Sequence, residues 1–268
     1  MGASAHEDTA RMAVLREQAT MLTKDRAVCI QAVDYSETSQ VVTLFARLSG
    51  KVRAIAKGSK RPKSPFDGPI EVLSFGDVVF SDSGKDRLAT LTEFQQQPVR
   101  GELRRSLFAL HSGLFAAELL NSLTDEYDPH LVLFDHFIRF LQDIEEGTVG
   151  GERRDILIRV ILFQLVLLHE VGLRPIFNAC ANCKRPFGAD WRESYFSASA
   201  NGLICRDCEM SFPDKIRLST KAVNCLTDVK RIANADDKTL DEIERVLMRH
   251  FTGILGHRPR MAEYIQEG

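Results

Sequence analysis

The spacing of apolar residues changes near residue 99, from alternation to a helical period. Before that point, five short segments are rich in β-branched and apolar residues, and glycines and prolines separate them. Five short strands in about 75 residues predict a small closed barrel, for which the five-stranded OB-fold is the usual solution. The expected strands are residues 26–33, 40–45, 51–56, 70–80 and 88–95.

After residue 99, leucines recur every three or four positions, which predicts the buried face of a helix. A later segment, 152–171, is apolar nearly all round, so we expect it at the centre of a helical bundle. The chain end after residue 255 carries Gly256, His257 and Pro259 and is expected to be loose. The leucines of the first helix are Leu103, Leu107, Leu110, Leu114 and Leu120, and the other expected helices are residues 130–146, 219–232 and 240–255.

These elements indicate an α+β protein with an N-terminal OB-fold barrel and a central helical domain that contains an inserted knuckle with four cysteines. The C-terminal helices are expected to complete the helical domain. The expected parts are an N-terminal extension (1–20), the OB-fold barrel (21–98), the helical domain (99–177), the knuckle (178–213) and the C-terminal helices (214–268).

The overall composition is that of a globular protein, with 44% hydrophobic and 27% charged residues in a chain of 268. No uncharged apolar run approaches the roughly 18 residues of a membrane span, and residues 1–18 lack the apolar core of a secretory signal. We therefore expect a cytoplasmic protein. Thiols stay reduced there, so the six cysteines favour a metal site over disulfides.

Four of the cysteines form two pairs with two residues inside each pair, Cys180 and Cys183, then Cys205 and Cys208. Such tight turns can direct four thiolates at one metal ion, and a tetrahedral sulfur set suits one structural Zn²⁺. A redox dithiol, unrelated buried cysteines and an iron–sulfur cluster are the alternatives. Nearby cations would offset the charge of a zinc–thiolate centre; these are Lys184, Arg185 and Arg206.

Positive charge is concentrated in one stretch although the net charge of the chain is −2. Six cations and no acidic residue lie between residues 51 and 63, whereas residues 101–175 hold seven basic against twelve acidic residues. The basic stretch predicts a polyanion-binding surface, and Tyr35 and Phe66 are nearby aromatics able to stack on bases. An ordinary solvated edge strand is the alternative. The candidate DNA-binding residues are Lys51, Arg53, Lys57, Lys60, Arg61 and Lys63.

Signatures of enzymes are absent from the sequence. It has no phosphate-binding GxxxxGK[ST] loop, and His169-Glu170 lacks the second histidine of a metalloprotease motif. Ser36 and Ser39 are explained by a turn or a helix cap rather than by a nucleophile. We therefore expect a protein that binds and does not catalyse.

In combination, these segments resemble the RecO family of bacterial DNA repair and recombination mediators. The resemblance is carried by Asp34-Tyr-Ser-Glu-Thr-Ser-Gln40, by Gly50-Lys-Val-Arg-Ala-Ile-Ala-Lys-Gly58 and by both cysteine pairs. It covers about residues 22–250. Two positions depart from the family pattern: Lys184 stands where a glycine often follows the first pair, and Asn201-Gly202 where Gly-Gly often precedes the third cysteine.

The resemblance implies single- and double-stranded DNA binding, strand annealing and help in loading the RecA recombinase in the RecF pathway. It also implies two protein partners, RecR and the C-terminal tail of single-stranded-DNA-binding protein. That tail is acidic with an apolar end, and Arg153, Arg154 and Arg159 are candidates to receive it. Alternatively, these arginines pair with Glu152 and Asp155 on an ordinary helix. A zinc-ribbon RNA-binding or transcription factor and a thiol oxidoreductase are the competing functions.

Overall fold

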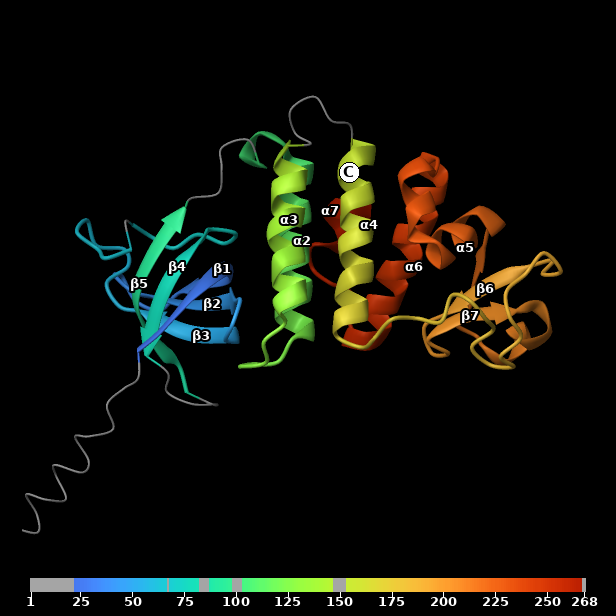
Figure 1. Cartoon of the computed structure of the whole chain (residues 1–268), viewed down its shortest axis with the longest axis horizontal. Helices are drawn as coiled ribbons and strands as arrows, with labels where there is room; N and C mark the ends of the chain where they lie inside the picture. The colour runs from blue at the N-terminus through green and yellow to red at the C-terminus, as the bar shows by residue number, and fades with distance from the viewer. Residues whose placement is uncertain (1–21, 67, 82–86, 98–102, 147–152, 267–268) are drawn as a thin grey trace, which may run out of the picture.

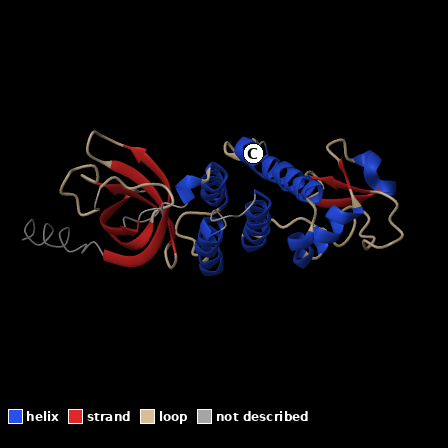
Figure 2. Cartoon of the chain, turned by 90° about the horizontal axis from the view of Figure 1, so that it is seen from above, coloured by secondary structure: helices blue, strands red, loops and turns tan. Residues whose placement is uncertain are grey.

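The computed structural model describes residues 22–66, 68–81, 87–97, 103–146 and 153–266, so the extension expected at residues 1–20 lies outside the described part. A β-barrel, a group of helices and a small β-sheet follow one another along the long axis of the molecule (Figure 1). The view from above shows the same order, with the helices between the two β-structures (Figure 2).

The barrel consists of five strands in the closed order β1-β2-β3-β5-β4. Strands β3 and β5 pair in parallel, and the other pairs are antiparallel. This topology confirms the five-stranded OB-like barrel that the sequence predicts. The strands are β1 (Leu22–Asp34), β2 (Gln40–Ala46), β3 (Gly50–Ala56), β4 (Phe75–Ser81) and β5 (Ala89–Gln97).

Apolar side chains fill the barrel, and Val52, Ala54 and Ala56 of β3 are fully buried in it. Their alternation places every second residue inside, as the pleat of a strand requires. Strand β4 begins later than residue 70, the start that the sequence suggested. Ile70 is buried in the barrel core, but Leu73 has a φ of 73°, a left-handed conformation of a turn and not of a strand.

Helix α4 lies at the centre of the helices, where it packs against α2, α3 and α6. Most of its apolar residues are therefore buried, as its sequence predicts, whereas Leu162 and Val166 are half-buried. The helices are α2 (Leu107–Leu123), α3 (Leu131–Glu146), α4 (Arg153–Glu170), α5 (Thr220–Thr227), α6 (Asp237–Leu255) and α7 (Ala262–Gln266). None of the helices in the described ranges is long and apolar enough to cross a membrane.

Helix α2 buries only part of the leucine face that the sequence predicts. Leu103 and Leu120 are buried, but Leu107 is 70% exposed. Ala109, Ala116 and Leu119, which lie outside the predicted face, are fully or almost fully buried. The buried face contains small residues, so neighbouring elements come close. At Gly113, a Cβ atom would lie 2.8 Å from the side chain of Leu73. Close packing on this face outweighs the burial of the larger leucines.

The chain end is not loose, contrary to the sequence-based expectation. The carboxylate of Glu118 on α2 accepts hydrogen bonds from the backbone N–H groups of Arg260, at 2.7 Å, and Met261, at 2.9 Å. His250 is buried, and its Nε2 lies 2.9 Å from the carbonyl oxygen of Leu173. The helix expected over 219–232 is also divided: α5 ends at Thr227, and a 3₁₀ helix, η3 (Val229–Asn234), follows.

The barrel is joined to the helices by apolar and polar contacts. The ring of Phe45 on β2 lies 6.0 Å from that of Phe134 and 6.5 Å from that of Phe137, both on α3. Beside these rings, Arg47 forms a two-pronged ion pair with Asp135. Part of the outer face of β1 and β2 is therefore covered by protein.

The small sheet stands at the far end of the helices. Its three antiparallel strands have the order β7-β6-β8. They are β6 (Ser194–Ser197), β7 (Gly202–Cys205) and β8 (Ile216–Leu218), and a 3₁₀ helix, η2 (Arg206–Ser211), follows β7 directly.

Candidate metal centre, nucleic-acid surface and helical groove

The four paired cysteines come together beside the small sheet. Cys180 and Cys183 belong to a tight turn, Cys205 ends β7, and Cys208 lies in η2. The turn is fixed to β7 by a hydrogen bond from the N–H of Ala181 to the carbonyl oxygen of Leu203, at 2.7 Å. Backbone pairing therefore brings the two cysteine pairs to one place.

The four sulfur atoms lie close enough together to share one metal ion. All four Sγ atoms lie within 4.8 Å of one another, and the sulfurs of Cys183 and Cys205 are 3.8 Å apart. Four thiolates at the zinc–sulfur distance of about 2.3 Å would have their sulfurs about 3.8 Å apart. This cluster can hold a metal ion, and its geometry fits Zn²⁺.

Backbone N–H groups prepare Cys180 for metal binding. Burial raises the pKa of this thiol, but hydrogen bonds from backbone N–H groups, that of Cys205 foremost, lower it more, to about 7. The thiolate, which is the metal-binding form, is therefore accessible near neutral pH.

Two of the cations near the cysteines have acidic partners. The cation of Arg185 is paired with Asp207 at 2.9 Å, and that of Arg206 lies 3.7 Å from Glu193.

The two departures from the family pattern lie at positions with unusual backbone geometry. Lys184 has a φ of 64° and Asn201 a φ of 52°, conformations that glycine adopts without strain and asparagine tolerates. The N–H of Lys184 still donates to the carbonyl oxygen of Cys180 at 2.9 Å. At Gly202, a Cβ atom would lie 2.5 Å from the carbonyl oxygen of Ile176. The chain thus keeps glycine where close approach demands it.

Lys51 does not belong to the basic surface, which corrects the sequence-based assignment. It is 9% exposed, and its Nζ donates to the carbonyl oxygen of Asn121, at 2.7 Å, and to that of Thr124. These are orphan carbonyls at the C-terminal end of α2, where a cation is favourable. Burial lowers the pKa of Lys51. This lysine joins the barrel to the helices.

Two other cations of the stretch have acidic neighbours. Arg53, on the same side of β3 as Lys51, is exposed and lies 3.7 Å from the carboxylate of Glu126. The ammonium of Lys60 donates to Asp34 at 2.7 Å.

The aromatic ring of Phe66 is 1% exposed in the barrel core, so it cannot stack on a base, contrary to the suggestion from the sequence.

Three cations of the stretch remain exposed on the loop after β3. Lys57, Arg61 and Lys63 form no ion pair with any residue that the structure describes. The loop itself is held in place: the hydroxyl of Ser59 donates to Gln40 at 2.9 Å, and Gly58 has a φ of 71° that supports the turn. We define these three cations as the basic loop. They present positive charge from a fixed backbone.

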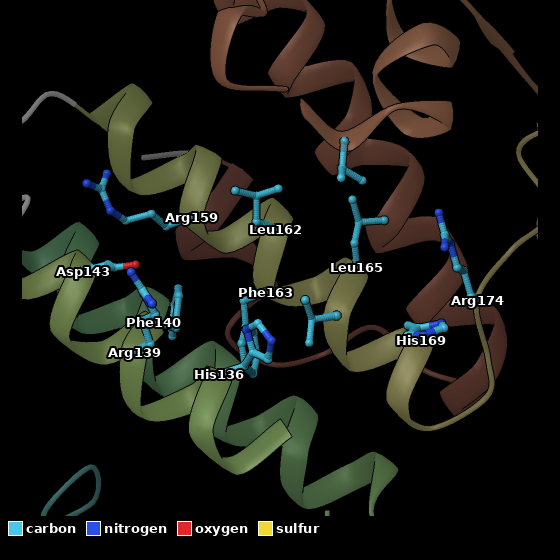
Figure 3. Close-up of a pocket in the computed structure, with 12 residues that line it drawn as sticks. His136, Arg139, Phe140, Asp143, Arg159, Leu162, Phe163, Leu165, His169 and Arg174 are labelled. Atoms are coloured by element: carbon cyan, nitrogen blue, oxygen red, sulfur yellow. The ribbon is translucent and has the colours of Figure 1, made fainter. Parts of the chain in front are cut away.

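A groove opens between α3 and α4, and sequence reasoning missed it except for Arg159. Its volume is about 520 Å³. Phe140, Leu162 and Val166 provide apolar walls. Charged side chains, among them Arg139, Arg159 and Arg174, lie around the groove (Figure 3). The ionisable residues that line it are His136, Arg139, Asp143, Arg159, His169 and Arg174.

The groove could have been partly inferred from the polar stripe of α3. His136, Arg139 and Asp143 recur at three- and four-residue spacing around Phe140, so they share one face of the helix. The lining is completed by residues of α4, by Arg174, and by Val229 of η3. These come from segments far apart in sequence, and no local pattern joins them.

Arg153 and Arg154, the other two partner-binding candidates, do not line the groove. Arg153 donates to the carbonyl oxygen of Ile265 at 3.0 Å, and its guanidinium lies 5.0 Å from the ring centre of Phe108. Arg154 donates to the carbonyl oxygen of Ala235 at 2.7 Å. Both arginines hold helices together.

Two family models match the chain. "Recombination protein O N terminal" matches residues 21–97, and "Recombination protein O C terminal" matches residues 104–262. The chain is 31% identical over 215 residues to the DNA repair protein RecO of Rhodopirellula baltica, which covers 80% of this chain and 77% of the relative. It is 28% identical over 234 residues to the DNA repair protein RecO of Bacillus subtilis, with 85% and 87% covered. The corresponding values for Listeria monocytogenes are 25% over 251 residues, with 91% and 94% covered.

Proposed function

Because this chain belongs to the RecO family of DNA repair proteins, we propose that it is a non-enzymatic recombination mediator of the RecF pathway. It binds single- and double-stranded DNA, anneals complementary strands and helps to load RecA onto DNA coated by single-stranded-DNA-binding protein. It works with RecR in the cytoplasm, at the nucleoid. Family membership favours this function over a zinc-ribbon RNA-binding or transcription factor.

The basic loop is the single observation that carries the DNA-binding part. Lys57, Arg61 and Lys63 are exposed and have no anionic partner among the described residues. Binding of phosphates to these cations releases the counterions condensed on DNA, which drives association. Phosphates carry no base information, so the loop accepts any sequence. Neutralised strands repel each other less, and this promotes annealing.

The salt dependence of binding tests this role. Three or four contacts imply a slope of log affinity against log salt of about −2 to −3 on single strands. Replacement of Lys57, Arg61 and Lys63 by alanine should reduce the magnitude of that slope by about 2 and weaken binding alike on all sequences. A basic loop that is merely solvated would leave slope and affinity unchanged.

A matched control removes the same charge from another part of the molecule. Lys230, Lys238 and Arg245 are exposed on η3 and α6 and form no ion pair with another described residue. Replacement of these three by alanine changes the net charge equally. If both triple variants lost affinity to the same extent, net charge and not the basic loop would govern binding.

The groove is the second element of the function. An acidic tail with an apolar end requires an apolar cleft beside cations. Phe140, Leu162 and Val166 supply the apolar walls, and Arg139, Arg159 and Arg174 outnumber the single acidic residue of the lining. We place the tail of single-stranded-DNA-binding protein here, with Arg159 retained from the residues expected to receive it.

The cysteine cluster has a structural role in this account. Cys180, Cys183, Cys205 and Cys208 would hold one Zn²⁺ and would fill all four of its positions, whereas a catalytic zinc keeps one position open. The ion would join the turn before β6 to the end of β7. Its binding free energy would thus contribute to folding of this end of the molecule.

A further inference from the structure

The turn between β1 and β2 is joined to the basic loop, although about 20 residues separate them in sequence. The N–H of Lys60 donates to the carbonyl oxygen of Thr38 at 3.1 Å, and the N–H of Gly58 donates to the hydroxyl of Ser39 at 3.1 Å. The ion pair of Lys60 with Asp34, at 2.7 Å, adds a side-chain connection. The two segments therefore form one surface.

This surface carries an exposed aromatic ring. Tyr35 is 67% exposed, and its ring packs against no other described aromatic ring. Its backbone is fixed by a hydrogen bond from its N–H to the carbonyl oxygen of Ser39 at 3.0 Å. An exposed tyrosine leaves the large apolar face of its ring in contact with water. Because this ring is held on a fixed turn, its face is available to a ligand.

The charge beside the ring is net positive. Asp34 is neutralised by Lys60, which leaves Glu37 as the acidic residue of the turn against the three cations of the basic loop. An aromatic ring beside cations is the combination with which proteins bind unpaired nucleic acid: phosphates contact the cations and a base stacks on the ring.

The covered faces of the barrel direct DNA to this end. In OB-folds, the face of the second and third strands and the loop between the first two strands commonly bind oligonucleotides. Here Phe45 of β2 packs on α3 and Lys51 of β3 is buried against α2. Much of the strand face is thereby occupied, whereas the loop that holds Tyr35 is exposed.

We propose that Tyr35 stacks on an unpaired base and thereby makes the protein bind single-stranded DNA more tightly than double-stranded DNA. The inference rests on the DNA-binding function proposed above. The basic loop holds the phosphates of either form, but a base is free to stack only in a single strand. When a complementary strand pairs with the bound one, the base leaves Tyr35 and the duplex is held less tightly. The protein thus holds the annealed duplex less tightly than the single strand from which it formed.

The experiment compares wild type, Tyr35→Ala and Tyr35→Phe of the full chain, each binding an oligothymidylate and a duplex of equal length. Stacking contributes about 1–3 kcal/mol per base, so Tyr35→Ala should bind single strands about 5- to 150-fold more weakly. Its duplex affinity should change less than twofold, and its salt slope should equal that of wild type because no phosphate contact is lost. Tyr35→Phe should retain single-strand binding.

An oligonucleotide without bases supplies the second readout. Wild type and Tyr35→Ala should bind it equally, since it offers nothing to stack. Unchanged single-strand affinity in Tyr35→Ala, or an equal loss on single strands and duplex, would overturn the role of Tyr35. Absence of any DNA binding by wild type would overturn the proposed function itself. Tyr35 is exposed, and the unfolding midpoint of each variant establishes that its fold is intact.

Discussion

The ammonium of Lys51 on β3 lies 2.7 Å from the carbonyl oxygen of Asn121, near the end of α2. A second bond, to the carbonyl oxygen of Thr124, completes the cap. The barrel thus supplies the cation that the C-terminal end of the helix favours. In sequence this lysine looks like a member of the basic stretch, but in the structure it holds two parts of the molecule together.

Replacement of Lys51 by methionine keeps the apolar stem and removes the cap. The two carbonyl groups would lose their donor, which costs about 1–3 kcal/mol of unfolding free energy. Lys57→Met is the matched control on an exposed site and should change stability by about 0.5 kcal/mol or less. Urea unfolding of both variants measures the difference. Equal stabilities would show that the cap is dispensable.

The sequence predicts what depends on local spacing and misses what depends on distant contacts. Alternation along β3 and the cysteine spacing are local, so the barrel and the convergence of Cys180 and Cys205 follow from them. The buried face of α2 depends on which neighbours pack closely, so Leu107 was misplaced. Lys51 is buried because the barrel packs on α2. The alternation along β3 predicts only that the side chain of Lys51 points out of the barrel.

Purified protein should contain about one zinc per chain. Cys205→Ser should lose the metal and part of the stability, because zinc binding contributes to folding. Cys225→Ser, a change at a buried cysteine outside the cluster, should retain the ion. Metal analysis by plasma mass spectrometry, with unfolding curves, makes the comparison. Iron, or no metal in wild type, would contradict the assignment.

Peptide binding to the groove should depend on its own cations. Removal of Arg139, Arg159 and Arg174 should weaken binding of an acidic peptide with an apolar end by about tenfold or more for each cation that contacts it, because a charge-assisted bond contributes about 1.5–3 kcal/mol. Val166→Glu should also weaken it by placing a carboxylate in the apolar wall. Calorimetric titration tests both variants, with Arg245→Ala as the control. Affinities equal to that of wild type would remove the groove from the account.

Glu244 makes the stability of the helices depend on pH. This residue on α6 is 2% exposed, and Gln164 on α4 donates to its Oε2 at 2.6 Å. Its other oxygen and the amide oxygen of Gln164 have no hydrogen bond within the described structure. A proton on Glu244 could satisfy both. Burial raises the pKa of Glu244 to about 7; the hydrogen bond from Gln164 and the charge of Arg153 act against the shift, and the charge of Asp241 adds to it.

The sign of this effect follows from the raised pKa. The unfolded carboxyl titrates near 4.5, so the folded state binds more protons between that pH and about 7, and stability falls across this range as pH rises. The loss is on the order of 3 kcal/mol. Glu244→Gln should remove this dependence, and we expect it to exceed wild type in stability at pH 8. Parallel curves of unfolding free energy from pH 4.5 to 8 would contradict the prediction.

Strand annealing tests the central claim most directly. Complementary oligonucleotides coated with the cognate single-stranded-DNA-binding protein are mixed, and pairing is followed by fluorescence quenching. Wild type should accelerate pairing strongly, the control with Lys230, Lys238 and Arg245 changed to alanine should match it, and the variant with Lys57, Arg61 and Lys63 changed to alanine should lose most of the acceleration. No acceleration by wild type, or full acceleration by the basic-loop variant, would contradict the account.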